Sequence, residues 1–298
     1  MKFVVYSCRF TVGLFLLSQL AFGHAQAEER SSSDLNVGQA KSGQKYAIQF
    51  VPAKKTFRFT ERLGTFIGGA PSNADFKAVS DLLQQETALY PRRLVEETGL
   101  RRIVLCDCLT INGWALVGFA YPERREIFID VTAARRDEQR ARALIHHEFF
   151  HLIDEKLQPS LRSPNWVSLN QPTFRYRCRA AGGYGARDDT DRDMLSEKYP
   201  GFLNSYSTSD ECEDRAEVFA HLIVHSSYLS RRMAEDRVLR TKVAWIKDVL
   251  AKWCPEAGGG FWEEAQKLER PPQRRPALSK EEPPRHRVEP GEAKGPGN

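Results

Sequence analysis

The spacing of apolar side chains divides the chain into a strand-rich first part and a helical second part. Between the strand-like runs, residues 73–99 carry apolar side chains at helical spacing. Within this region we expect Pro91 to begin a second helix and Gly99 to end it. The predicted strands are YAIQFV (46–51), TFRFT (56–60), RIVLCDCL (102–109), GWALVGFAY (113–121) and REIFIDV (125–131).

Helical spacing dominates from residue 133 onward. A long helix is expected from about Ala133 to Leu157, with Pro159 just beyond it as a stop signal. Residues 158–205 are rich in Pro, Gly, Asn and Asp, which predicts an irregular region. Two further helices are expected at about 210–225 and 230–253.

The first 27 residues have the pattern of a secretory signal peptide. Lys2 and Arg9 supply a positive start, residues 10–22 an apolar run, and Ala25-Gln26-Ala27 a small-x-small cleavage site. The alternative, an uncleaved membrane anchor, is disfavoured because a helix needs roughly 20 apolar residues to span a bilayer. We therefore expect a secreted or periplasmic protein that is not inserted in a membrane once the signal is removed.

Composition suggests three parts after the signal. Residues 28–44 are small and polar and are expected to form a flexible lead-in, followed by a domain at 45–267. The final segment, 268–298, holds seven of the 16 prolines among mixed charges, which is typical of a disordered tail.

Net charge excludes one class of partner. The formal charge of +5 falls to about +1 without the two basic residues of the signal and the seven basic and five acidic residues of 269–298. A nearly neutral central region has no electrostatic footprint for nucleic acid.

Five cysteines remain after the signal is removed, namely Cys106, Cys108, Cys178, Cys212 and Cys254. Export permits disulfide bonds, and an odd number leaves at least one thiol free or paired between chains. Cys106 and Cys108 lie two apart in a predicted strand and should therefore share a face. No second cysteine pair matches them, so disulfide or core roles are favoured over metal binding.

The segment HEFFH, residues 147–151, carries the strongest chemical signal. His147 and His151 are four apart, so a helix presents both imidazoles to one ion, while Glu148 is turned toward a metal-bound water. The motif could arise by chance, but an apolar helix would bury three costly polar groups without a role for them. His146 points to another face, and we assign it no role.

A catalytic zinc site needs a third protein ligand, and residues 206–221 offer two candidates. Glu213 and Glu217 are also four apart on a predicted helix. One could bind the ion while the other accepts a hydrogen bond from a ligand histidine. In isolation, a solvated acidic face is an equally good interpretation; spacing alone does not choose between the carboxylates.

With these motifs in place, the chain resembles the gluzincin branch of zinc metallopeptidases, including the catalytic domain of anthrax lethal factor and bacterial zinc-binding metallopeptidases. HEFFHLID is similar to their HEFxH segment with its following acid, and YSTSDECEDRAEVF (206–219) is similar to their second motif. NWVSLNQPTFRY (165–176) resembles the segment between the motifs. The resemblance covers about 75 residues, and it departs from lethal factor at Phe150, where that protein has a small residue.

The resemblance implies an α+β, zincin-like fold: a small mixed sheet, an edge strand over the HExxH helix, and a second ligand-bearing helix. REIFIDV is placed to be that edge strand, although its alternation also fits an ordinary core strand. The implied site is one Zn²⁺ held by His147, His151 and Glu213, with Glu148 as base. Tyr206 would stabilise the oxyanion, and Glu217 and Asp154 would support the ligands from behind.

The expected function is therefore an exported zinc metallopeptidase acting on a peptide or protein substrate, with no nucleic-acid partner. Two alternatives stay open. One is a catalytically silent secreted binding protein that keeps the zinc site, which Glu148 argues against because a structural metal needs no base. The other is a zinc hydrolase of a non-peptide amide, for which the chemistry would be the same.

Overall fold

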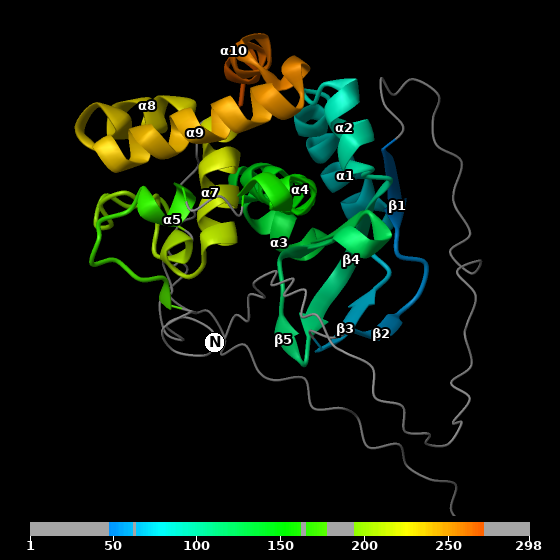
Figure 1. Ribbon diagram of the computed structural model, residues 1–298. Coiled ribbons are helices and arrows are strands. Elements are labelled where there is room, and N and C mark those ends of the chain that lie inside the picture. Colours follow the sequence, from blue (N-terminus) through cyan, green and yellow to red (C-terminus); the bar gives the residue numbers. More distant parts are fainter. Residues whose placement is uncertain (1–47, 62–63, 162–164, 178–193, 271–298) are drawn as a thin grey trace, which may run out of the picture.

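The computed structural model describes residues 48–61, 64–161, 165–177 and 194–270. The predicted signal peptide and lead-in, Cys178 and all but the first three residues of the predicted tail lie outside this part of the chain. A mixed sheet packs with one face against helices, and the long helix α4 lies between the sheet and the C-terminal helices (Figure 1). This arrangement confirms the predicted α+β class.

One sheet holds the strands of the described residues, in the order β2-β3-β4-β7-β6, with β1 and β5 also paired to β4. β4 runs parallel to β1 and β7 and antiparallel to β3 and β5. β3 was not predicted, because its sequence GTFIGG carries glycines at both ends. The bounds are β1 Gln49–Pro52, β2 Phe57–Glu61, β3 Gly64–Gly69, β4 Arg102–Ile111, β5 Trp114–Ala115, β6 Gly118–Tyr121 and β7 Glu126–Asp130.

The assignment of REIFIDV as the edge strand is wrong. This segment forms β7, which pairs with β4 on one side and β6 on the other and is buried at all five positions. β6 is the edge strand, joined to β7 by the 3₁₀ turn Pro122–Arg124 and packed against α4. A strand with neighbours on both sides and cover on both faces reads as a continuous apolar run, and IFI at 127–129 does so.

The shared face predicted for Cys106 and Cys108 is also wrong. Cys106 is buried, whereas Cys108 is exposed and adopts a left-handed backbone conformation with φ of 53°. This irregularity lies where β4 changes partners, from β1 and β7 in its first half to β3 and β5 in its second. The four described cysteines are all free thiols, so none of them forms the expected disulfide bond.

The first helices follow the sequence pattern closely. Helix α1 is Asn73–Thr87, and α2 is Arg92–Thr98, ending at Gly99 with φ of 68°. The single helix expected from residue 133 is two: α3, Val131–Arg136, and α4, Glu138–Leu161. Asp137 separates them, because its extended backbone breaks the helix and its side chain accepts from the N–H of Arg140 at 2.9 Å.

The C-terminal helices pack around α7, and the apolar core runs from α1 through α4 and α7 to α9 and α10. The helix predicted at 230–253 is interrupted at Asp236, whose side chain caps the next helix at Leu239. No helix in the described ranges is long and apolar enough to cross a membrane. The remaining bounds are α5 Asn165–Ser168, η3 Tyr206–Thr208, α7 Glu211–Val224, α8 Ser226–Glu235, α9 Arg237–Trp253, η4 Pro255–Ala257 and α10 Gly259–Lys267.

Candidate metal centre

Helix α4 presents the two histidines of the HEFFH segment to one point. One helical turn separates them, and the Nε2 atoms of His147 and His151 lie 3.1 Å apart, with their rings nearly perpendicular. Both side chains lie in the interior, where α4 meets α7. Two imidazole nitrogens at this separation can both bind the same metal ion.

Helix α7 supplies a carboxylate to the same point. Oε2 of Glu213 lies 3.1 Å from Nε2 of His147 and 3.5 Å from Nε2 of His151. Its other oxygen, Oε1, is buried without a hydrogen-bond partner. Within the described part of the chain, these three residues are the group whose ligand atoms, all within 4.8 Å of one another, could hold a metal ion.

The geometry of this group fits zinc. Zinc in proteins binds imidazole nitrogen and carboxylate oxygen at about 2.0–2.1 Å in tetrahedral geometry, which places neighbouring donor atoms about 3.3 Å apart. The separations of 3.1, 3.1 and 3.5 Å agree with that spacing. Three protein ligands leave a fourth position open, as in catalytic rather than structural zinc sites.

The charges of the group are strongly coupled. Burial lowers the pKa of His147, but the carboxylates of Glu213 and Glu217 together raise it by more than burial lowers it, so the net shift is upward. Burial raises the pKa of Glu213, whereas His151 and His147 lower it, and the net shift is downward. The carboxylate is thus held in its ionised form, which is the form that binds a cation.

The side chain of Glu148 extends from α4 to the edge strand β6. It is buried, and the backbone N–H of Ala120 in β6 donates a hydrogen bond to its carboxylate. Burial raises the pKa of Glu148, partly offset by His147 and His151. A carboxylate with a raised pKa beside a metal centre is a suitable group for accepting and returning a proton.

Glu217 approaches His147 from the opposite side of its ring. Its Oε1 lies 2.8 Å from Nδ1 of His147, the nitrogen that faces away from the group of three ligand atoms. Its Oε2 accepts hydrogen bonds from Asn204 Nδ2 and His221 Nε2. The two carboxylates that spacing could not tell apart therefore occupy different places, with Glu213 among the ligand atoms and Glu217 behind His147.

Tyr206 and Asp154 complete the set of residues singled out in the sequence. Tyr206 lies in η3, just before α7, and its ring stacks on that of His147 with centroids 5.7 Å apart. Asp154 forms a buried two-pronged pair with Arg215, at 2.8 and 2.9 Å. Since Asp154 is on α4 and Arg215 on α7, this pair ties together the two helices that carry the candidate ligands.

A polar cluster beside Glu213 escaped the sequence analysis. Asp214 Oδ2 accepts hydrogen bonds from Trp166 Nε1 at 2.9 Å, Tyr176 OH at 2.7 Å and Lys242 Nζ at 2.7 Å. Trp166 and Tyr176 are two of the three aromatic positions of the segment between the two motifs, and through them that segment anchors α7 beside Glu213.

A second buried network lies around His146, to which no role was assigned. Its Nε2 lies 3.0 Å from Glu86 Oε2, and its Nδ1 lies 2.7 Å from the hydroxyl of Tyr90. Glu86 also accepts from Arg142 and Arg270. These contacts join α1, α4 and the C-terminal end of the described chain.

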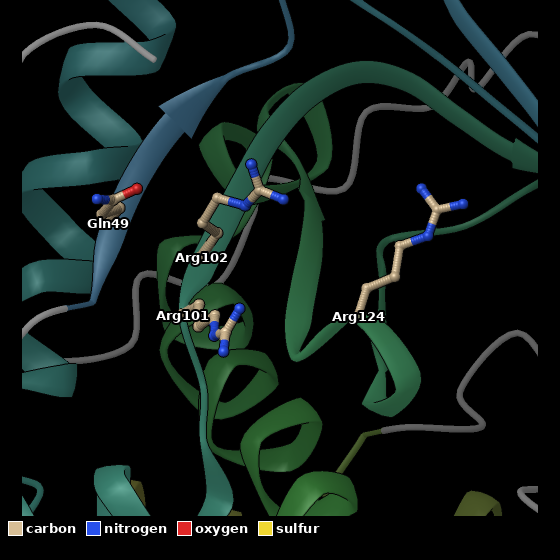
Figure 2. A pocket seen from close by; sticks show the side chains of 4 residues that line it. All are labelled: Gln49, Arg101, Arg102 and Arg124. Atoms are coloured by element: carbon tan, nitrogen blue, oxygen red, sulfur yellow. The ribbon is translucent and has the colours of Figure 1, made fainter. Parts of the chain in front are cut away.

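A hollow of about 350 Å³ lies at the start of β4 and is built from other residues than the metal group. Figure 2 shows its three arginine side chains pointing in different directions instead of converging. Arg102 forms an ion pair with Glu126, and Arg124 forms one with Glu61. The lining residues are Gln49, Arg101, Arg102 and Arg124. We assign no ligand to this hollow.

Comparison with known proteins gives one distant likeness. No protein-family model matches the chain, and no curated protein matches its sequence. Among solved structures, the chain is similar to "a putative zinc-binding metallo-peptidase from Bacteroides caccae", with 16% identity, a TM-score of 0.42, and coverage of 74% of this chain and 84% of that one. At this level of similarity, the assignment of a metal centre rests on its own geometry.

Proposed function

We propose that this protein is an exported zinc-dependent peptidase. The observation that carries the proposal is the convergence of His147, His151 and Glu213, with Glu148 buried beside them. A structural zinc site is usually closed by four protein ligands, whereas this group has three and an adjacent acid. A bound zinc ion would supply a Lewis acid that lowers the pKa of water and polarises a carbonyl oxygen.

In this proposal, Glu148 performs the proton transfers. Its carboxylate takes a proton from the attacking water and delivers it to the leaving amine. The hydrogen bond from the Ala120 backbone holds the carboxylate in place, and its raised pKa makes it a stronger base toward the attacking water. Tyr206, stacked on His147, donates its hydroxyl hydrogen to the oxyanion that develops on the substrate.

The edge strand supports a peptide as the substrate. β6 pairs with β7 on one side only, in the order of strands given above, and the same strand contacts Glu148 through Ala120. An extended peptide can add to a free sheet edge through backbone hydrogen bonds. A peptide bound there would pair with β6 and run past the proposed base.

The deciding experiment is Glu148→Gln in protein purified without chelator. We expect about one zinc per chain in both proteins, and peptide cleavage reduced roughly 10²–10⁴-fold in the variant, because only the base is removed. Glu138→Gln, at an exposed position near the start of the same helix, is the matched control and should cleave like the wild type.

Equal cleavage by Glu148→Gln would contradict the mechanism, and loss of zinc from it would make Glu148 structural. A wild-type protein that holds zinc yet cleaves no member of a peptide library would exclude peptides. The remaining alternatives would then be a non-peptide amide as the substrate, or a binding protein without catalytic activity.

A further inference from the structure

A line of polar side chains continues behind the metal centre, away from the proposed substrate. It begins at Nδ1 of His147, which lies 2.8 Å from Glu217 Oε1. The other oxygen of Glu217 lies 3.2 Å from Nε2 of His221, and Nδ1 of His221 lies 2.8 Å from Nδ1 of His225. The line thus runs along α7 for about two turns, from Glu217 to His225, the residue that follows the helix.

The charge of Glu217 fixes which nitrogens of its two histidine neighbours carry a hydrogen. An ionised carboxylate can only accept, so the ring nitrogens that face Glu217, His147 Nδ1 at 2.8 Å and His221 Nε2 at 3.2 Å, must each carry their hydrogen on that side. The Nδ1 atoms of His221 and His225, 2.8 Å apart, share one hydrogen bond in which either ring can be the donor. With its Nδ1 protonated, His147 keeps the lone pair of Nε2 free for the ion.

The contacts around Glu217 lie in the interior of the protein. His221, Glu217 and Asn204 are all buried, and burial, followed by the charges of His221 and Arg270, lowers the pKa of His225 to about 3. A neutral His225 has one ring hydrogen and one lone pair, so its Nδ1 can donate to His221 or accept from it. Replacing His221 by an apolar group would leave the buried Glu217 without one of its donors.

We propose that His221 is a positioning residue of the metal centre. It acts on His147 through Glu217, and His225 holds the opposite edge of the His221 ring in place. The inference rests on the proposed metal site but not on the identity of the substrate. The competing interpretation is that His221 only satisfies the buried Glu217 and stabilises the fold, without any effect on metal binding.

The test compares two replacements of His221 in the full chain. His221→Phe fills a similar volume without a donor, whereas His221→Gln places an amide N–H near the position of Nε2. Zinc affinity is measured by competition with a coloured chelator, and thermal stability is measured on the metal-free proteins. We expect His221→Phe to bind zinc roughly 10-fold more weakly, since outer partners of ligand histidines contribute 10–100-fold. His221→Gln should recover most of that loss.

His146→Phe is the matched control. His146 is an equally buried histidine whose contacts go to Tyr90 and Glu86 rather than to the metal group. The His146→Phe variant should have a lower melting temperature than the wild type and an unchanged zinc affinity. His225→Ala, at the half-buried end of α7, is a second variant that keeps the test available if His221→Phe does not fold. It should weaken zinc binding in the same direction and by less.

Several results would overturn the proposal. Wild-type affinity in His221→Phe and His225→Ala, an equal loss in His221→Gln and His221→Phe, or an equal loss in His146→Phe would each make His221 structural only. If the wild type binds zinc tightly and the variants bind it equally well, this inference fails while the proposed function stands. A wild type without zinc would overturn the proposed function together with it.

Discussion

Glu213 and Glu217 show at the scale of single residues how one helical turn changes the chemistry of a carboxylate. Both project from α7 toward α4, and both are buried. Glu213 meets the Nε2 atoms of the two histidines, while Glu217 meets the opposite nitrogen of His147. The two residues are about 6 Å apart along the helix axis, so their carboxylates reach opposite edges of the same imidazole ring.

We predict that Glu213→Ala yields largely metal-free protein, because two histidines are too few to hold zinc tightly. Glu217→Ala should retain zinc with affinity or activity reduced roughly 10–100-fold, since it removes a partner of a ligand and not the ligand. Metal content measured on both purified variants checks this. The reverse pattern would move the third ligand to Glu217.

At the scale of elements, the position of β6 depends on a glycine. A Cβ added at Gly118 would lie 2.9 Å from both the Ile129 side chain and the Phe128 carbonyl oxygen, and 3.2 Å from the Leu144 side chain on α4. The strand is therefore pressed against β7 and α4 together. That close approach brings the Ala120 N–H within hydrogen-bonding reach of Glu148.

We predict that Gly118→Ala lowers the free energy of unfolding by about 1–3 kcal/mol, because neither β7 backbone nor α4 can yield cheaply. Peptide cleavage should fall as well, since a displaced β6 no longer holds the proposed base. Gly259→Ala is the control: nothing lies within 4 Å of a Cβ there, so it should be neutral or slightly stabilising. Denaturant unfolding of the three proteins decides, and equal stabilities would show that β6 has room to shift.

At the scale of the whole molecule, the network around Glu86 connects distant parts of the chain. Glu86 on α1 accepts from Arg142 on α4 and from Arg270, which lies 184 positions further along. Burial raises its pKa, but His146 and Arg270 lower it more, to about 2 from an ordinary value of 4.5. A depressed carboxylate pKa means that the ionised form stabilises the fold above about pH 4.5, and that this contribution is lost as the pH falls toward 2.

We predict that Glu86→Gln is less stable than the wild type by about 3 kcal/mol at pH 7, the equivalent of the pKa difference. The gap should narrow as the pH falls below about 4.5 and nearly close near pH 2. Urea unfolding at several pH values measures it. Glu96→Gln, which alters an exposed pair with Arg92, should show a gap near zero throughout. A gap for Glu86→Gln that stays constant down to pH 2.5 would contradict the role assigned to this network.

The sequence by itself determined the features that depend on neighbours within a turn or a strand. The spacing of His147 and His151 places both on one face of any helix, and Gly99 ends α2 because it adopts the left-handed backbone conformation that its position needs. Apolar runs located most of the strands for the same reason. These are local properties, so periodicity and turn chemistry were enough to predict them.

Only the tertiary structure decided which parts meet across long separations. It placed β6 and not β7 at the edge, because two strands compete for the same side of β4 and burial favours the more apolar one inside. It split the predicted helices at Asp137 and Asp236, where capping side chains outweigh helical spacing. It also brought Asn204 and His221 to Glu217, contacts that arise from packing and leave no periodic trace in the chain.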